Sequence, residues 1–334
     1  MEINKRNIRT WSLLGPSGAH GVAALELAET KPDVLMLTSD LCFFSGLERF
    51  KSLYPDRIIN TGIAEQNMIG IAAGLTKEGF IPFANTYARF CSSRCADQIR
   101  VNMSYMRLPI KLIGLTAGYG AGILGATHMG IEDASLMRAL PGITVISPAD
   151  CTEIVKSIIA AADTQDPTYI RLTGPMNMPI VYKEDYDFQI GKAIKLQEGD
   201  DICIIASGSM VYHSLQAAKG LEEDGITSTV INMHTLKPFD DEIVLSAGQK
   251  YKLIVTAEEH NVIGGLYGAV AECLCRSGSH APVVPFGIND TFVHAGSYDY
   301  QMKESGLTAD NMKKVIKDFL LVQGTGNYYT GGLG

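Results

Sequence analysis

Short apolar runs alternate with longer segments of helical periodicity, and this alternation restricts the possible folds more than any other feature of the sequence. In the first half, the apolar runs predict strands at Asp33–Thr38, Ile81–Asn85, Ile110–Thr116, Thr144–Ile146 and Thr168–Leu172. The segments between them predict helices at Ala19–Glu29, Glu65–Lys77, Arg89–Met106, Glu132–Leu140 and Thr152–Ala162. Continuous apolar runs are typical of strands buried on both faces, so we expect a mainly parallel sheet with helices on each side.

The alternation stops at a polar segment and then begins again. Residues 175–189, with two prolines and the charged run Lys183–Asp187, predict a linker between a first domain over 1–174 and a second over 190–322. The second domain has strand patterns at Ile202–Ala206, Thr227–Asn232, Lys252–Ala257 and Val283–Phe286. Its helical patterns lie at Val211–Gly220, Asp240–Ala247, Gly265–Cys275 and Ala309–Leu321. We therefore predict an α/β protein of two doubly wound domains, followed by a flexible glycine-rich tail over 323–334.

Two helix starts carry capping signals. Asp150 followed by Glu153 matches a capping box in front of the helix over Thr152–Ala162. Thr308 stands directly before the last predicted helix, where a hydroxyl group can accept a hydrogen bond from a free backbone N–H. These signals support the predicted element boundaries.

Composition and charge exclude several classes of function. The net charge of −8 argues against a nucleic-acid or anionic-membrane partner. The sequence shows no signal-peptide core and no segment of transmembrane length. The cysteines number seven and lie in apolar segments, which favours buried thiols over disulfides or zinc ligands. We expect a cytoplasmic protein with no metal site of its own.

A glycine-containing loop follows the predicted strand over Ile110–Thr116 and raises the alternative of a dinucleotide-binding oxidoreductase. Gly118, Gly120 and Gly122 have the G-x-G spacing that begins the dinucleotide-binding fingerprint G-x-G-x-x-G. Ile123, however, stands where the third glycine of that fingerprint belongs. No acidic residue follows at the expected distance, and the sequence contains no Walker A motif. Tight turns explain these glycines better than a nucleotide site does.

Several motifs, in order, resemble those of one enzyme family. The stretches INTGIAEQNMIGIAAGLTKEGFIPF (59–83) and ATHMGIEDASLMRALPGITVISPAD (126–150) resemble the pyrimidine-binding domain of thiamine diphosphate enzymes of the transketolase and deoxyxylulose-phosphate synthase branch. INMHTLKPFD (231–240) and VTAEEHNVIGGLYGAVAE (255–272) resemble the transketolase C-terminal domain. The GDG…N motif of the diphosphate-binding domain is absent. The chain therefore resembles the C-terminal (beta) subunit of a split transketolase-like enzyme.

The resemblance implies a cofactor and a partner. Thiamine diphosphate would bind between this chain and an alpha subunit that carries the GDG…N motif. That partner would hold most of the ligands of a Mg²⁺ or Ca²⁺ ion. Two copies of each chain would form an α2β2 assembly, and this chain alone would be inactive.

Glu65 is the residue that the sequence singles out first. A carboxylate among small and apolar residues is rarely buried unless it is paired or used. Its position in the first turn of a helix offers a simpler explanation, since negative charge is favoured there. The resemblance implies instead that Glu65 hydrogen-bonds the cofactor's aminopyrimidine and promotes the tautomer through which the cofactor deprotonates itself. Gly62 and Ile63 would lie beside that ring, with Phe90 stacked on it and Tyr87 as a second choice.

His128 is the second catalytic candidate. The resemblance implies that it contacts the hydroxyl and carbonyl groups of the donor substrate, and a histidine can hydrogen-bond or carry protons near neutral pH. A structural histidine after a glycine loop is the simpler alternative. For His260 in the second domain, the resemblance implies a structural or interface role.

The candidate substrate pocket departs from the family pattern. Ser17 and Thr116 stand where transketolases commonly have arginine and histidine, and Ile123 and Leu124 replace an acidic pair. Arg and His are natural ligands for phosphate, so we expect an acceptor that is not an ordinary sugar phosphate, either a small molecule or a carrier-bound group. We predict two-carbon ketol transfer from a ketose. The alternatives are a 2-oxo-acid-decarboxylating, acyl-transferring subunit, like those of dehydrogenases or deoxyxylulose-phosphate synthase, and a non-catalytic scaffold.

Overall fold

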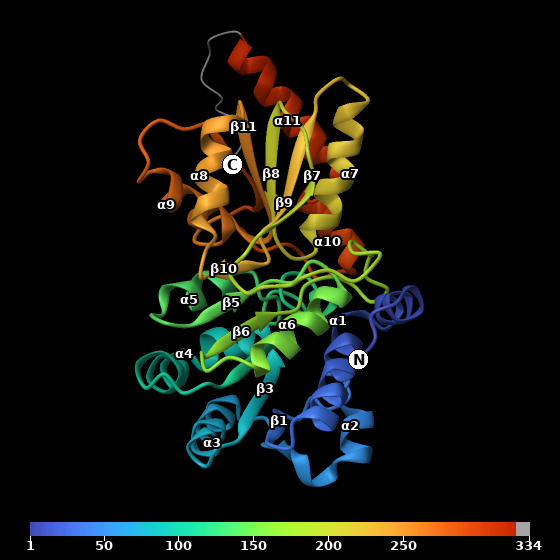
Figure 1. The fold of residues 1–334 in the computed structure, drawn as a ribbon, viewed down its shortest axis with the longest axis vertical. Helices are drawn as coiled ribbons and strands as arrows, with labels where there is room; N and C mark the ends of the chain where they lie inside the picture. The colour runs from blue at the N-terminus through green and yellow to red at the C-terminus, as the bar shows by residue number, and fades with distance from the viewer. Residues whose placement is uncertain (325–334) are drawn as a thin grey trace.

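The computed structural model describes residues 1–324, which form two α/β units arranged end to end along the long axis (Figure 1). The first unit contains a seven-stranded sheet with the strand order β10-β5-β6-β4-β3-β1-β2. All neighbouring strands are parallel except β10, which is antiparallel to β5. The strands are β1 (Val34–Thr38), β2 (Ile58–Asn60), β3 (Ile81–Tyr87), β4 (Lys111–Leu115), β5 (Thr144–Ile146), β6 (Thr168–Arg171) and β10 (Thr235–Lys237).

Helices cover both faces of this sheet, as the apolar runs predicted. One face is packed by α1 and α6, around side chains such as Leu27 and Ile158. The other face is packed by α3, α4 and α5, around Met68, Ile99 and Met137. The helices are α1 (Lys5–Thr30), α2 (Glu48–Leu53), α3 (Glu65–Lys77), α4 (Ala96–Ile99), α5 (Asp133–Ala139) and α6 (Cys151–Ala162).

Two predicted helices differ from those in the structure. Helix α1 begins at Lys5 rather than Ala19. It consists of two helical segments joined at a kink, where Gly15 has a non-helical backbone with φ 72° and Pro16 follows. The predicted helix over Arg89–Met106 is regular only in α4. π-helical turns over Phe90–Arg94 and Arg100–Tyr105 flank it, and such turns occur frequently at functional sites.

The second unit contains a five-stranded sheet with the order β12-β11-β8-β9-β7, in which only β7 is antiparallel to its neighbour. Its strands are β7 (Ile194–Gln197), β8 (Ile202–Ala206), β9 (Ser228–Asn232), β11 (Leu253–Asn261) and β12 (Val283–Ile288). Its helices are α7 (Met210–Glu222), α8 (Asp241–Lys250), α9 (Leu266–Leu274), α10 (Tyr298–Glu304) and α11 (Ala309–Gly324). The predicted tail over 323–334 lies almost entirely outside the described residues.

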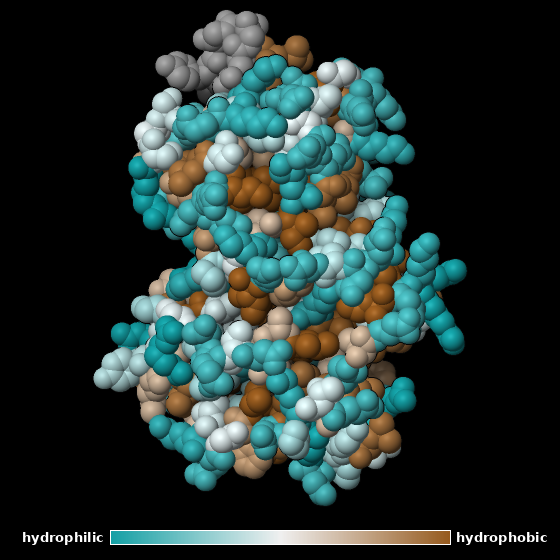
Figure 2. Space-filling model, viewed as in Figure 1, coloured by the Kyte–Doolittle hydropathy of each residue, from teal (hydrophilic) through white to brown (hydrophobic). Residues whose placement is uncertain are grey.

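The two units share a sheet and a core. Strand β10 comes from the second half of the chain but extends the first sheet at β5, so residues 235–237 lie with the first unit (Figure 1). One apolar cluster runs through both units, from Met68 on α3 to Val270 on α9. The outline narrows where the units meet, and apolar residues reach the viewed surface at that level (Figure 2). The two units are therefore joined by more than the linker over 175–189.

Both predicted helix starts are capped. The Asp150 carboxylate accepts a hydrogen bond from the Glu153 N–H (2.9 Å), and the Glu153 carboxylate accepts one from the Ala149 N–H (2.6 Å). The hydroxyl of Thr308 accepts a hydrogen bond from the Asn311 N–H (3.3 Å). None of the helices in residues 1–324 combines the length and apolarity needed to span a bilayer.

Candidate functional site

The candidate residues follow the carboxyl ends of three parallel strands. Glu65 lies just after β2, Phe90 just after β3, and His128 in the long loop between β4 and α5. Strands β3 and β4 are neighbours, and β1 alone separates β3 from β2. Ligands of open α/β sheets bind outside this edge, where the loops converge. The topology therefore brings the three candidates to one side of the first sheet.

Glu65 is buried and paired. It opens α3, and the residue before it, Ala64, provides no capping side chain. Its side chain is only 4% exposed, and its Oε1 accepts a hydrogen bond from Nη1 of Arg94 at 2.7 Å. A buried carboxylate without a partner would be costly, so this ion pair explains how the acid is tolerated in the fold. The sequence did not indicate this partner.

Arg94 joins the carboxylate to an aromatic face. Its guanidinium carbon lies 3.9 Å from the centroid of the Phe90 ring, within the range of a cation–π contact. Its side chain is 43% exposed, and its carbonyl accepts a hydrogen bond from the Gln66 side chain (3.0 Å). A planar cation with N–H donors thus lies against Phe90 and Glu65 together. The only sequence signal for it was a single arginine among small residues, four positions after Phe90.

Phe90, Tyr87 and His128 form one ring cluster. The ring of His128 lies 5.0 Å from that of Phe90 and 5.8 Å from that of Tyr87, and the two aromatic rings are 5.7 Å apart, all in edge-to-face geometry. His128 Nδ1 is 2.9 Å from the hydroxyl of Thr127. Burial raises the pKa of the Tyr87 hydroxyl, which favours its neutral form. The structure thus brings the predicted site residues together. His128 contacts the rings of Phe90 and Tyr87 directly, and Glu65 is joined to Phe90 through Arg94.

A cavity of about 390 Å³ opens beside this cluster. Its lining residues are Arg89, Phe90, Ser93, Arg94 and Thr127. Nε of Arg89 lies 3.3 Å from the carboxylate of Glu132, so both arginines of the lining are ion-paired. A larger cavity of about 970 Å³ follows β12 in the second unit and shares none of these residues.

Gly62 and Ile63 lie on the exposed turn before α3. Gly62 has φ 69°, a conformation that favours glycine, and its N–H donates to the Asn60 side chain (3.0 Å). A Cβ at this position would contact nothing within 4 Å, so open space lies beside it. The side chain of Ile63 is exposed. Both lie on the turn that leads into α3, the helix that Glu65 opens.

The four residues predicted to line the substrate pocket do not all lie near the ring cluster. Thr116 follows β4 with φ 51°, and its buried hydroxyl has no partner among the described residues. Ile123 and Leu124 are exposed on a short 3₁₀ turn in the loop that also carries His128. Ser17 lies on α1 and takes part in none of the contacts that join the described residues of the ring cluster.

A buried ionic network, which sequence reasoning missed, lies where the two units meet. Arg171 forms two 2.9 Å hydrogen bonds with Asp133, which also accepts one from the hydroxyl of Tyr169 (2.7 Å). Burial raises the pKa of Asp133, but the Arg171 charge and hydrogen bonds outweigh this and hold it below its usual value. His260, fully buried on β11, accepts a hydrogen bond from the Ser135 N–H (3.3 Å), and burial lowers its pKa to about 4. It thus lies at the interface between the units.

The described residues contain no group of three or more His, Cys, Asp or Glu side chains arranged to hold a metal ion. All seven cysteines are free thiols. The chemical resources of the site are therefore a buried carboxylate, an aromatic face, a histidine and two paired arginines.

Comparisons with known proteins match nearly the whole chain. Residues 17–176 match the family model described as transketolase, pyrimidine binding domain, and residues 191–312 match that of transketolase, C-terminal domain. The chain is 41% identical to the 6-deoxy-6-sulfo-D-fructose transketolase subunit of Clostridium sp. strain MSTE9, over 88% of this chain and 89% of that protein. It is 35% identical to a subunit of the apulose-4-phosphate transketolase of Phocaeicola vulgatus, over 89% and 94% of the two chains.

A solved structure described as a split gene transketolase, inactive beta4 tetramer, superposes with a TM-score of 0.84. It is 38% identical to this chain and covers 91% of it, while 98% of that structure's own chain is matched. The similarity therefore extends over both units and their arrangement.

Proposed function

Because the chain belongs to the transketolase family, we propose that it is the beta subunit of a split, thiamine diphosphate-dependent enzyme that transfers a two-carbon ketol unit from a ketose. Family and fold class are thus as predicted from the sequence, and the family consists of transferases that depend on thiamine diphosphate. The observation that carries the proposal is the contact of Glu65, through Arg94, with the ring cluster of Phe90, Tyr87 and His128.

The residues present fit the cofactor's aminopyrimidine. The Arg94 guanidinium is planar, carries N–H donors, and lies on the face of Phe90 while bonding to Glu65. An aminopyrimidine has the same two features, a flat face and polar hydrogens at its edge. One carboxylate and one ring of this chain therefore already hold a group of that shape. When bound, thiamine diphosphate supplies the nucleophilic carbon for breaking and forming carbon–carbon bonds beside a carbonyl group.

Each residue of this chain has a defined task in the proposal. Glu65 would hydrogen-bond a ring nitrogen of the bound cofactor in place of Arg94 and could share a proton with it, and the burial of Glu65 would favour this by excluding water. Phe90 packs against the ring, and Tyr87 supports Phe90 from the side. Gly62 and Ile63 border the approach, where the open space beside Gly62 leaves room for the cofactor.

His128 contacts the donor in the proposal. Its ring is fixed against Phe90 and Tyr87 by edge-to-face contacts, and the Thr127 hydroxyl engages Nδ1, which leaves Nε2 available to a substrate. From there it can hydrogen-bond a hydroxyl or carbonyl oxygen and exchange a proton with it.

The remaining cofactor contacts belong to a partner chain. We expect an alpha subunit with the GDG…N motif to hold the diphosphate and its Mg²⁺ or Ca²⁺ ion, within an α2β2 assembly in the cytoplasm. The absence of that motif from this chain, and the split-gene relatives, support this expectation. This chain alone should then lack activity.

We further propose that the acceptor is not an ordinary sugar phosphate. Arg89 lines the cavity, but it is already paired with the carboxylate of Glu132. Ile123 and Leu124 present apolar surface on the same loop as His128. The relatives are named for a sulfonated sugar and a phosphorylated sugar, so the named substrates differ within the family.

The test is a substrate screen of the complex of this chain with its alpha subunit. Ketose donors and pyruvate are offered with aldehyde acceptors that carry or lack a phosphate group. We expect turnover with a ketose and a phosphate-free or carrier-bound acceptor. Turnover of pyruvate alone would establish the acyl-transferring alternative, and efficient use of ribose 5-phosphate would refute the acceptor proposal. Glu65→Gln should abolish turnover, while Glu78→Gln on the exposed end of α3 should not.

A further inference from the structure

The loop between β4 and α5, residues 116–130, carries His128, Ile123, Leu124 and Thr116. Its ends are closed on each other, because the Gly118 N–H donates to the carbonyl of Gly130 at 2.7 Å. This bond lies two residues from His128, whose own N–H donates to the carbonyl of Gly125 (2.9 Å). The path of this short segment therefore decides where the histidine stands against the ring cluster.

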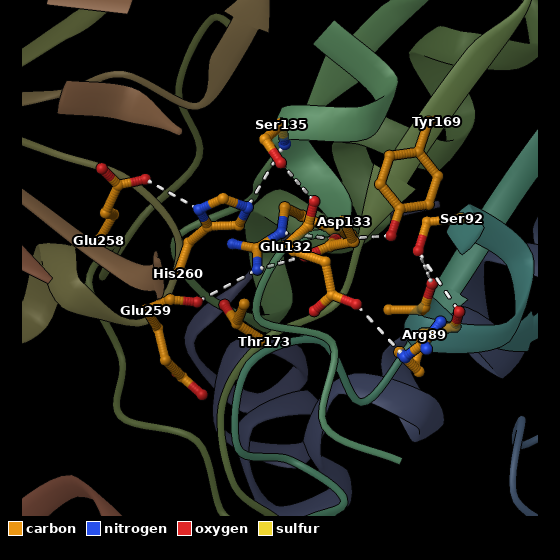
Figure 3. Close-up of polar contacts among 12 residues, drawn as sticks. Arg89, Ser92, Glu132, Asp133, Ser135, Tyr169, Thr173, Glu258, Glu259 and His260 are labelled. Carbon is orange, nitrogen blue, oxygen red and sulfur yellow. Dashed lines mark hydrogen bonds and ion pairs between the residues drawn. The ribbon is translucent and has the colours of Figure 1, made fainter. Parts of the chain in front are cut away.

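The second unit holds this loop through one buried carboxylate. Oε1 of Glu259, on β11, accepts a hydrogen bond from the Tyr119 N–H at 2.7 Å. Its Oε2 accepts hydrogen bonds from the hydroxyls of Ser209 and Tyr298, and its carbonyl accepts one from Arg171 (3.1 Å). Glu259 is completely buried, so these bonds are shielded from water. Figure 3 shows the ring of His260 directed toward Ser135 at the start of α5, while the side chain of Glu259, the preceding residue of β11, points the other way.

Further contacts of the second unit fasten the same loop. The buried amide of Gln301, on α10, donates to the carbonyl of Gly122 (3.1 Å) and to that of His294 (2.9 Å). The Tyr119 hydroxyl lies 2.6 Å from that of Ser305. The fit around Glu259 is tight, since a Cβ at Gly118 would stand 2.3 Å from its Oε1. Several contacts from β11 and α10 thus define the backbone next to the loop's closing bond.

We propose that Glu259 is a positioning residue of the active site, acting from the second domain through the backbone of residues 117–130 on the placement of His128 and of the Ile123–Leu124 turn. This inference rests on the proposed function in one respect, because it takes His128 as the donor-binding group. It assigns to the transketolase C-terminal domain of this chain a task in catalysis, although none of its residues belongs to the ring cluster or lines the cavity beside it.

A neighbouring residue provides the matched control. Glu258 is as buried as Glu259 and precedes it on β11, but its carboxylate accepts hydrogen bonds from the N–H groups of Leu266 (2.6 Å) and Tyr267 (2.8 Å), both in its own domain. It makes no hydrogen bond to residues 116–130 within the described chain. Glu258→Gln and Glu259→Gln therefore make the same chemical change at adjacent buried sites, and only one of them touches the loop.

The experiment compares these variants in the complete complex with the alpha subunit. Amide hydrogen exchange over residues 117–130 should become faster in Glu259→Gln and stay at the wild-type rate in Glu258→Gln. In the same complex, kcat/KM for the ketose donor should fall about 10- to 100-fold in Glu259→Gln, because small displacements of a catalytic group have effects of this size. The affinity for thiamine diphosphate should remain unchanged, since Glu65 and Phe90 lie on other elements.

Unchanged loop exchange in Glu259→Gln, or an equal loss of kcat/KM in Glu258→Gln, would overturn the inference. If Glu259→Gln fails to fold, Gln301→Met cuts the second attachment at Gly122 and should give the same pattern. The Oε1 of Gln301 has no partner among the described residues, so this change removes only the two donated bonds. The exchange measurement does not depend on turnover, so a wild-type complex without ketol transfer would refute the proposed function separately.

Discussion

At the scale of single residues, the site depends on a carboxylate that the chain has already neutralised. Glu65 is buried against Arg94, and Arg94 in turn covers the face of Phe90. A group that binds to both Glu65 and Phe90 must therefore first move Arg94. If the pyrimidine ring binds as proposed, Arg94 occupies its place, and we therefore expect this arginine to stabilise the protein without cofactor and to lower the affinity for the cofactor.

Replacing Arg94 by methionine tests this competition. Methionine keeps an apolar side chain near Phe90 but removes the charge and the donors. We expect thiamine diphosphate to bind roughly 3- to 10-fold more tightly, since a part-exposed ion pair and a cation–π contact each contribute up to about 1 kcal/mol. The melting temperature without cofactor should fall, because Glu65 would be left buried without a partner. Calorimetric titration of the complex measures the first effect, and a thermal scan measures the second.

Arg89→Met is the control for this prediction. Arg89 lines the same cavity but pairs with Glu132 and makes no ion pair with Glu65. It should leave the cofactor affinity within about twofold of wild type, as expected for the loss of a surface ion pair. Weaker cofactor binding in Arg94→Met would mean that the arginine helps to hold the cofactor instead of competing with it.

Sequence reasoning reached part of the site. Glu65, Phe90 and His128 were named together because the motifs that contain them resemble those of the transketolase family. The structure then shows that each follows the carboxyl end of a strand in the parallel part of the sheet, where loops converge. Arg94 was missed because its orientation depends on a π-helical turn that no periodicity predicts. Glu259 was missed because its partner Tyr119 lies 140 residues away, in the other unit. The predicted roles of the site residues and the predicted domain boundaries stay predictions.

At the scale of elements, α1 is held to the loop after β1 by a buried histidine. His20 is fully buried, and its Nδ1 lies 2.7 Å from the carbonyl of Ser45. Close packing surrounds it, since a Cβ at Gly21 would stand 2.2 Å from the carbonyl of Gly46. Burial lowers the pKa of His20 to about 4, so the folded protein keeps this ring neutral.

This histidine should make the fold sensitive to acid. Between about pH 6.5 and pH 4 the unfolded chain binds a proton at His20 and the folded protein does not, so stability falls as the pH falls through this window. The free energy of unfolding is lowered by about 3 kcal/mol at pH 4 through this group. His20→Gln should flatten the dependence of unfolding free energy on pH in this window. Urea denaturation between pH 4 and pH 8 measures it, and a slope equal to that of wild type would refute the assignment.

The start of α6 holds the linker as well as the helix. Oδ1 of Asp150 caps the helix, while its Oδ2 accepts hydrogen bonds from the N–H groups of Val181 (2.8 Å) and Tyr182 (2.9 Å). Asp150→Ala should therefore cost about 2–4 kcal/mol, more than the roughly 1 kcal/mol of a lost cap, because two further N–H groups lose their partner.

Asn4→Ala provides the comparison, because Asn4 caps α1 through a single bond to the Asn7 N–H (3.0 Å). Its cost in urea denaturation should stay near 1 kcal/mol. An equal decrease in the free energy of unfolding for the two variants would show that the hydrogen bonds from Asp150 to the linker do not stabilise the fold.

Long apolar runs made most elements predictable, and short edge strands escaped. Strands β2, β7 and β10 contain three or four residues and lie at the edges of their sheets. The equally short β5 and β6 are buried along their whole length and belong to apolar runs, whereas β2 and β7 are partly exposed and show no such run. The pairing of β10 with the first sheet could not be foreseen, because it joins segments about ninety residues apart. The capping box at α6 was predictable because it needs only local spacing.

At the scale of the whole molecule, the loop after β1 exposes two adjacent aromatic residues near the proposed cofactor approach. The side chains of Phe43 and Phe44 are 67% and 56% exposed, with their ring centroids 5.3 Å apart. The same loop is joined to the last residue of β2 by a hydrogen bond from Asn60 to Asp40 (3.0 Å). Exposed aromatic pairs of this kind often mark interaction surfaces. We therefore expect the alpha subunit to contact this surface.

The double variant Phe43→Ser, Phe44→Ser should therefore impair assembly and leave the fold intact. Burying one phenylalanine contributes about 1.5–3 kcal/mol, so the affinity for the alpha subunit should fall by at least about tenfold. The melting temperature of the isolated chain should stay close to wild type, because both rings are exposed in it. Leu321→Ser, at an exposed position on α11, is the control and should assemble normally. Analytical ultracentrifugation of the mixed chains measures the affinity, and wild-type assembly by the double variant would place the alpha subunit on another surface.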